Sequence, residues 1–149
     1  MPKYYFEDLV VGGAYEYEGR AISREEIVAF AREFDPQPFH VDEEAGRKSV
    51  YGGLIASGWH TVALCMRMLV DGFVNESASL GSPGADEIRW LKPVRPGDTL
   101  HLRAECIETT SSRSRPDRGR GRFRYEVKNQ RGEVVMTMIG MGLFRRRGF

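Results

Sequence analysis

The sequence predicts a single α+β domain, in which one long buried helix packs against an antiparallel sheet of about five or six strands. Three observations support this prediction. The 149 residues fall inside the usual range for one domain. One segment, Gly58 to about Phe73, is apolar on nearly every side. The second half of the chain contains several runs that alternate apolar and polar residues, which is the period of a β-strand.

The composition is that of a globular protein that folds alone. Apolar residues make up 41% of the chain, charged residues 29%, and the formal net charge is +1, which is unlike a disordered protein. The two cysteines, Cys65 and Cys106, lack the spacing of a disulfide framework or a zinc site. The first residues contain no apolar signal segment, and no stretch reaches the roughly 20 apolar residues of a membrane span. We therefore expect a cytoplasmic protein with no membrane partner.

The N-terminal third predicts a strand followed directly by a helix. Residues Ala14 to Ile22 alternate tyrosine with glutamate, as a half-buried strand does. Ser23 and Glu26 have the spacing of a capping box, so a helix should begin after Ser23. It should end at Asp35, because Pro36 disfavours the helical conformation of the residue before it. Its apolar stripe consists of Ile27, Phe30, Ala31 and Phe34.

Two prolines stiffen the next segment, Asp35 to His40, which we expect to be a short loop. Asp42 can cap a brief turn that follows it. Residues 51–58 are rich in glycine and lead into the central helix. Because apolar residues nearly encircle that helix, we expect other elements to wrap it.

The rest of the chain predicts four strands separated by turns at residues 93–98 and 129–132. In the last strand both alternating sets of side chains are apolar or small, so both of its faces should be covered. The predicted strands are Glu87–Leu91, Thr99–Glu108, Phe123–Asn129 and Glu133–Phe144.

Three residues form the best-supported candidate for a catalytic site. Asp35 ends a helix, so the helix dipole and partial burial should raise its pKa and make it a better base. His40 can give or take a proton near neutral pH, and the two intervening prolines limit its movement. Gly58, at the start of the central helix, can offer its backbone N–H to a developing oxyanion. The alternative is that Asp35 is an ordinary helix stop and His40 a surface histidine.

These residues carry a resemblance to a known family. The segment from Phe34 to His40, with Ile-Ala-Ser-Gly at residues 55–58, resembles the hydratase motif of the MaoC-like family, which includes the (R)-specific enoyl-CoA hydratases. The family pattern is Asp-x-Asn-Pro-x-His, followed by a Gly-Gly-x-Ile-Ala-x-Gly segment. The likeness extends to residues 6–12 and 89–98 and so covers most of the chain. Gln37 departs from it, since it stands where the motif usually has asparagine.

The resemblance implies a hot-dog fold, a long central helix wrapped by a curved antiparallel sheet, in one domain spanning residues 1–149. It also implies a homodimer or higher oligomer that binds acyl-CoA near the subunit interface, with CoA as part of the substrate and no separate cofactor. Asp35 and His40 become the catalytic pair, and Gly58 the donor to the thioester oxygen. We expect substrate contacts from Gln37, Ser57, Trp59 and His60.

The implied reaction is reversible hydration of a trans-2-enoyl thioester, in which Asp35 activates water and His40 protonates the α carbon. Two alternatives stay open. A hot-dog thioesterase shares the fold and the acyl-CoA but hydrolyses the thioester. A non-catalytic acyl-CoA-binding or partner subunit also shares the fold, although it would not need both Asp35 and His40.

The basic residues are gathered in the second half of the chain. Residues 1–102 carry a net charge of −6 and residues 103–149 a net charge of +7. Arg118, Arg120, Arg122 and Arg124 alternate, so in a strand they share one face and could cradle the phosphates of CoA; the alternative is a solvated hairpin tip. We expect no nucleic-acid partner, because the chain lacks a stacking-aromatic motif. The three histidines have no metal-ligand spacing, so no metal site is expected.

Overall fold

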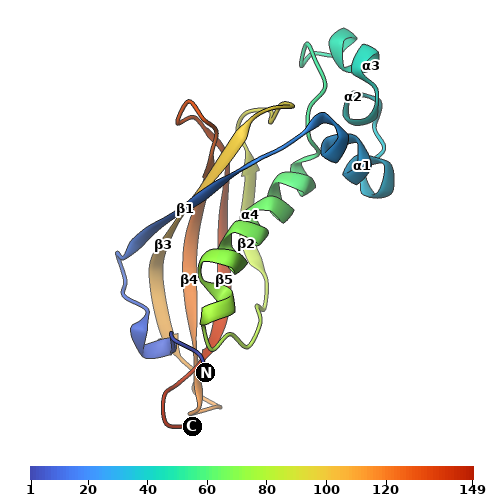
Figure 1. Ribbon diagram of the computed structural model, residues 1–149. Coiled ribbons are helices and arrows are strands. Elements are labelled where there is room, and N and C mark those ends of the chain that lie inside the picture. The colour runs from blue at the N-terminus through green and yellow to red at the C-terminus, as the bar shows by residue number, and fades with distance from the viewer.

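The computed structural model describes residues 1–149, and in it one helix lies across the face of a five-stranded sheet (Figure 1). Every neighbouring pair of strands is antiparallel, and their order in the sheet is β1-β3-β4-β5-β2. The predicted α+β class is confirmed. The strands are β1 (Ala14–Ala21), β2 (Ala85–Trp90), β3 (Thr99–Ser111), β4 (Arg118–Lys128) and β5 (Val134–Arg145).

The central strand β4 shows how the sequence selects the two faces of the sheet. Its side chains alternate, so that one set is buried in the core while the other lies on the opposite face. The buried set faces the layer that contains the helix, and four arginines occupy the outer face. The buried set is Gly119, Gly121, Phe123, Tyr125 and Val127.

Helix α4 (Gly58–Gly72) is the predicted central helix. Its buried side chains include Leu64, Cys65 and Met68, which join one core with residues of β3, β4 and β5. The sheet covers only one side of α4, however. Trp59 is 56% exposed and Met66 is 46% exposed, so the elements of one chain do not surround the helix on every side. The apolar residues that encircle the helix therefore include a face that the chain leaves open.

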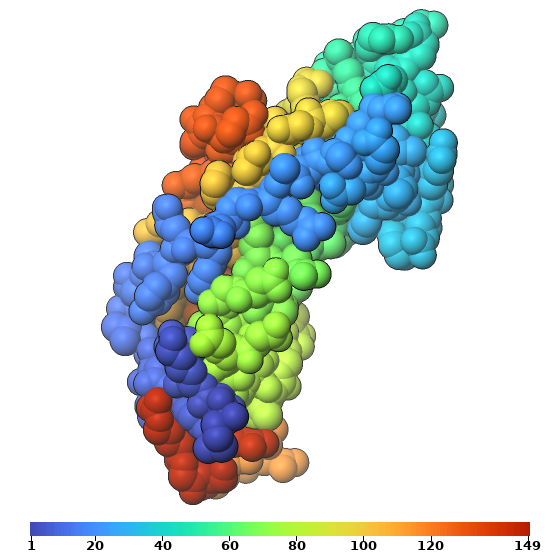
Figure 2. All heavy atoms as spheres, viewed as in Figure 1, coloured from blue at the N-terminus to red at the C-terminus, as the bar shows by residue number.

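Helices α1 (Arg24–Phe34), α2 (Pro38–Val41) and α3 (Glu43–Lys48) form a lobe beyond one end of the sheet (Figures 1 and 2). Ser23 and Glu26 make both hydrogen bonds of the predicted capping box at the start of α1. The expected loop before His40 is in part helical. Pro38 occupies the first position of α2, where its missing N–H costs nothing, so a proline there begins a helix instead of preventing one.

The chain termini lie at the opposite end of the molecule from this lobe (Figure 1). Both cysteines are buried and unpaired, as the sequence predicts. None of the helices combines the length and hydrophobicity that a membrane span requires.

Candidate active site

Asp35 and His40 meet where the lobe joins the central helix. Asp35 is the C-terminal cap of α1, and its N–H donates to the Ala31 carbonyl. His40 lies on α2 and is buried against the segment that leads into α4. The Asp35 Oδ2 and His40 Nε2 atoms lie 3.3 Å apart. The structure thus brings the two predicted catalytic side chains together.

Backbone contacts hold the imidazole of His40 from behind. Its Nδ1 lies 2.7 Å from the carbonyl oxygen of Ile55, and the Ile55 N–H donates to the Phe39 carbonyl in return. A carbonyl can only accept, so Nδ1 carries a proton and donates it. The other nitrogen, Nε2, is therefore the one that faces Asp35 and that exchanges its proton during any reaction.

Two further side chains hold the carboxylate of Asp35. Ser57 Oγ donates to Oδ2 at 2.7 Å, and Gln37 Nε2 donates to Oδ1 at 2.8 Å. The Asp35 side chain is 19% exposed and that of His40 is 6% exposed. Gln37 thus makes a hydrogen bond with Asp35 despite replacing the usual asparagine. The carboxylate is fixed from both sides and keeps a narrow opening to solvent.

The pKa of Asp35 is opposite in direction to the sequence prediction. Burial raises it, but the hydrogen bonds from Ser57 and Gln37, together with the charge of His40, outweigh that effect. The pKa of Asp35 therefore lies below its usual value, and the expectation of a raised pKa is wrong. The dipole of α1 favours a raised pKa, but the donors Ser57 and Gln37 lie outside that helix and lower the pKa.

A proton count follows from these contacts. If Asp35 is ionised and His40 is neutral, the lone pair of Nε2 points at a negative oxygen, which is repulsive. A proton on Nε2 turns the same contact into a charge-assisted hydrogen bond. In that form of the pair a base and an acid lie side by side.

Gly58 lies next to this pair with a free donor. It is the first residue of α4, so its N–H has no partner within the helix, and no acceptor elsewhere in the chain meets it. The ring of Trp90 lies against it, and a Cβ at this position would be 2.4 Å from the ring. Trp90 Nε1 also donates to the Gly58 carbonyl at 2.9 Å. Only glycine fits here without moving the tryptophan.

The other predicted substrate contacts are distributed unevenly. Trp59 packs edge-on against Trp90, and both rings are about half exposed beside Gly58. Ser57 is completely buried and its hydroxyl donates to Asp35, so a contact between Ser57 and substrate stays a prediction. His60 is also buried, and its ring stacks on Phe30 of α1. Burial lowers the pKa of His60, and its Nδ1 has no hydrogen-bond partner.

Arg118 and Arg120 lie far from the pair within one chain. Thr99, at one end of β3, pairs with Ala21, and the chain runs from Ala21 into α1. Gly119, which lies between the two arginines, pairs with Ser111 at the other end of β3. At about 3.3 Å per residue, the two ends of β3 are roughly 40 Å apart. The four alternating arginines do share one face of β4, but Arg118 pairs with Asp117 and Arg120 with Glu108. Their contact with substrate stays a prediction that a single chain does not support.

One part of the site had no signal in the sequence. The Ile55 carbonyl fixes the tautomer of His40, but any residue supplies the same backbone oxygen. Only the fold, which places residue 55 beside α2, reveals this role.

A large cavity lies away from the catalytic pair. A space of about 970 Å³ opens between α4 and the inner face of the sheet, and it does not include Asp35 or His40. Trp59 lines it, so it begins next to Gly58. Most of its lining is apolar, including Val62, Met66, Ile88 and Met138. No group of three or more metal-binding side chains is gathered anywhere in the chain.

Comparison with known proteins assigns the family. The model of the MaoC like domain matches residues 8–129. This chain belongs to the MaoC-like domain family. The crystal structure of a MaoC-like dehydratase from Rhodospirillum rubrum is 42% identical with a TM-score of 0.86, covering 97% of this chain and 99% of that one.

Two more distant structures support the fold of this MaoC-like protein. The R-hydratase PhaJ1 from Pseudomonas aeruginosa is 23% identical with a TM-score of 0.72, covering 96% of this chain and 90% of that chain. A Mycobacterium tuberculosis protein described as having a double hotdog fold is 14% identical with a TM-score of 0.81, covering 97% of this chain and 45% of that one. The predicted hot-dog fold is confirmed.

Proposed function

We propose that this MaoC-like protein is a hydro-lyase that adds water to, or removes it from, a trans-2-enoyl thioester of coenzyme A. The observation that carries the proposal is the contact of 3.3 Å between Asp35 and His40, with the free N–H of Gly58 close by. Membership in a family that contains dehydratases supports the reaction class.

The proposed reaction starts from an ionised Asp35 and from a His40 that carries a proton on Nε2. Asp35 accepts a proton from water as the water oxygen bonds to the β carbon. The electron pair of the double bond moves toward the thioester, whose oxygen accepts a hydrogen bond from the Gly58 N–H. His40 then gives its Nε2 proton to the α carbon. Each acid–base role typically contributes about 10²- to 10⁴-fold to the rate.

The contact between the two side chains also restores the catalyst. After hydration, Asp35 holds the proton that came from water and His40 has lost one. Transfer from Asp35 Oδ2 to His40 Nε2 returns both groups to their starting states. No third residue has to move a proton, and the reverse sequence describes dehydration.

We further propose that the active protein is a homodimer. Strand β2 is at the edge of the sheet, with β5 on one side and no strand on the other. Trp59, Ala63 and Met66 are exposed on the open face of α4, and all three also line the apolar cavity. A second copy of the chain can cover this surface, because contiguous exposed apolar surfaces mark interfaces between proteins. The free buried thiols fit a reducing compartment such as the cytoplasm.

The test uses crotonyl-CoA as substrate. Loss of the ultraviolet absorbance of the enoyl thioester, without release of free thiol, is the expected result. Release of free thiol would instead indicate a thioesterase. If neither signal changes with crotonyl-CoA or with longer and branched enoyl-CoAs, the hydro-lyase proposal is wrong, and a non-catalytic binding subunit becomes the better description.

A further inference from the structure

Arg95 holds an unpaired positive charge close to the active-site segment. Its Nη2 donates to the carbonyl of Tyr51 at 2.6 Å, and no carboxylate lies within ion-pair distance of its guanidinium. A Cβ on Gly53 would be 3.1 Å from Nη1, so the glycine leaves room beside the guanidinium. The N–H of Gly53 meets no acceptor in the chain. Arg95 itself is half-buried, so part of its charge faces solvent.

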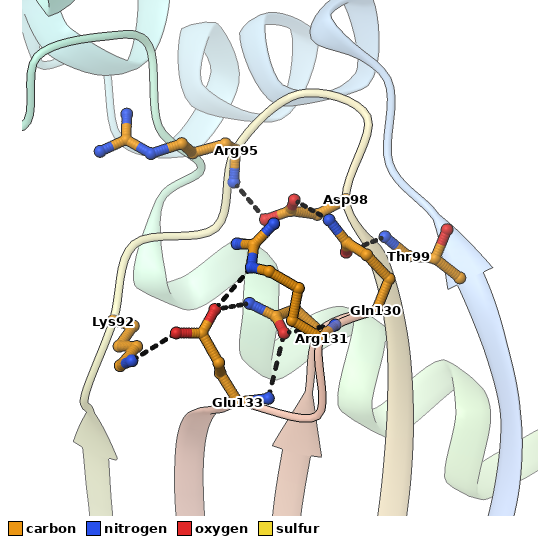
Figure 3. Close-up of polar contacts among 8 residues, drawn as sticks. Lys92, Arg95, Asp98, Thr99, Gln130, Arg131 and Glu133 are labelled. Atoms are coloured by element: carbon orange, nitrogen blue, oxygen red, sulfur yellow. Dashed lines mark hydrogen bonds and ion pairs between the residues drawn. The ribbon is translucent and has the colours of Figure 1, made fainter.

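A polar network fixes the loop that carries Arg95 (Figure 3). The Arg95 N–H donates to Asp98 Oδ2 at 2.9 Å, and Gln130 Nε2 donates to Asp98 Oδ1 at 2.9 Å. Asp98 is only 6% exposed. Gln130 in turn accepts from the Thr99 N–H at 3.1 Å. Figure 3 shows the guanidinium turned away from this network, which leaves its remaining donors free.

Two chains of contacts connect this guanidinium to the catalytic pair. Val94, the residue before Arg95, accepts a backbone hydrogen bond from Ala56, the neighbour of Ile55 and Ser57. On the other side, the Tyr51 ring lies 5.3 Å from the ring of Phe39, which contacts His40 edge-on at 4.5 Å. Arg95 and its neighbour Val94 thus contact the segment of residues 51–57, which also holds Asp35 and His40 through Ser57 and Ile55.

We propose that Arg95, together with the N–H of Gly53, binds a phosphate group of the carrier to which the acyl chain is attached. This inference rests on the proposed function. A guanidinium with free donors beside a glycine N–H is suited to a phosphate, because several N–H groups can point at its oxygens at once. Coenzyme A and the phosphopantetheine arm of a carrier protein both supply such a group, joined to the reacting thioester by a long, flexible arm.

Arg95 differs from the arginines of β4 that are conspicuous in the sequence. Arg118 and Arg120 have carboxylate partners and lie at the far end of the sheet. Arg95 is close to the pair and has no such partner. Within one chain, the phosphate contact therefore falls to an isolated arginine and not to the arginine-rich strand.

The experiment compares substrates with and without the phosphate. Activity of wild type and Arg95→Ala is measured on crotonyl-CoA, on a crotonyl carrier protein and on crotonyl N-acetylcysteamine, which has the thioester but no phosphate. We expect kcat/KM for crotonyl-CoA to fall about 10-fold or more, mainly through KM, because a charge-assisted hydrogen bond is lost. With crotonyl N-acetylcysteamine, kcat/KM should be the same for the variant and for wild type. Arg113→Ala, which removes an unpaired and exposed arginine in the turn between β3 and β4, is the matched control.

The substrate arms also identify the source of the phosphate. A loss with both crotonyl-CoA and the carrier protein assigns the phosphate of the pantetheine arm, and a loss with crotonyl-CoA alone assigns the nucleotide phosphates. Gly53→Ala, which crowds the guanidinium without removing it, should lower kcat/KM for the same substrates. An equal loss on all three substrates, or no loss on any, overturns the inference. Wild type that converts none of them contradicts the proposed function instead.

Discussion

Replacement of Ser57 by alanine tests how the carboxylate of Asp35 is held. The hydroxyl makes two contacts that alanine cannot make: it donates to Asp35 Oδ2 at 2.7 Å and accepts from the Trp59 N–H at 3.3 Å. Ser57 is completely buried, so no bulk water replaces the lost donor directly. The change removes one donor to a charged group and the side-chain cap of α4 at once.

The expected cost combines these two losses. A hydrogen bond to a charged group contributes about 1.5–3 kcal/mol, and a helix cap about 0.5–2 kcal/mol. Asp35 is partly exposed and the cap hydrogen bond is long, so we expect each contribution to lie at the lower end of its range. We expect the free energy of unfolding to fall by roughly 2 kcal/mol, which lowers Tm by about 4–8 °C in a chain of this length.

The pH dependence separates the two contributions. Because the pKa of Asp35 lies below its usual value, its ionised form stabilises the fold at neutral pH, and this stabilisation is lost as the pH falls through the folded-state pKa. The difference between wild type and Ser57→Ala should thus be largest at neutral pH and shrink in acid to the cap contribution alone. The acid limb of kcat/KM should move to higher pH in the variant, because a donor that lowers the pKa of Asp35 is gone.

Urea unfolding at several pH values, followed by tryptophan fluorescence, measures the stability difference. Ser114→Ala is the control, since Ser114 is exposed in the β3–β4 turn and makes no hydrogen bond. Equal unfolding midpoints for Ser57→Ala and wild type, together with an unchanged acid limb, would refute the account of how Asp35 is held.

Three further predictions concern other parts of the molecule. Gly58→Ala should destabilise the fold by about 1–3 kcal/mol and lower kcat, because its Cβ would meet the ring of Trp90; unchanged stability and activity would contradict this. Met66→Lys should convert the dimer to a monomer in light scattering, and a wild type already monomeric would refute the proposed interface. Cys65, whose pKa burial raises to about 12, should not react with a thiol reagent until urea unfolds the chain; fast reaction of the native protein would contradict its burial.

The regular elements could be predicted because their signals are local. The capping box at Ser23 and the proline after Asp35 mark both ends of α1. Alternation marks β4 only from Phe123 onward, because the arginine-rich residues before it also suit a hairpin tip, whereas the strand begins at Arg118. These signals depend on neighbours a few residues apart, so a single sequence contains them. The short helix α2 was missed because Pro38 is favourable at a first helical position as well as in a loop.

The candidate site residues could be named from the sequence, but the direction of the pKa shift of Asp35 could not. Asp35, His40 and Gly58 are where the motif places them, but the pKa of Asp35 depends on Ser57, which is 22 residues away in the sequence. The Ile55 carbonyl and Arg95 act through contacts that only the fold creates. A cluster of arginines is conspicuous in a sequence, whereas one arginine without an acidic partner is recognised only in three dimensions.

The most direct test of the central claim is the rate of crotonyl-CoA hydration by Asp35→Asn compared with wild type. Asparagine keeps the size of the side chain and its contact with Ser57, but it cannot accept the proton of water. The account predicts a folded variant, with a native circular dichroism spectrum, whose kcat is lower by about 10²-fold or more. A folded variant that keeps the wild-type kcat would show that Asp35 is not the base and would contradict the proposed mechanism.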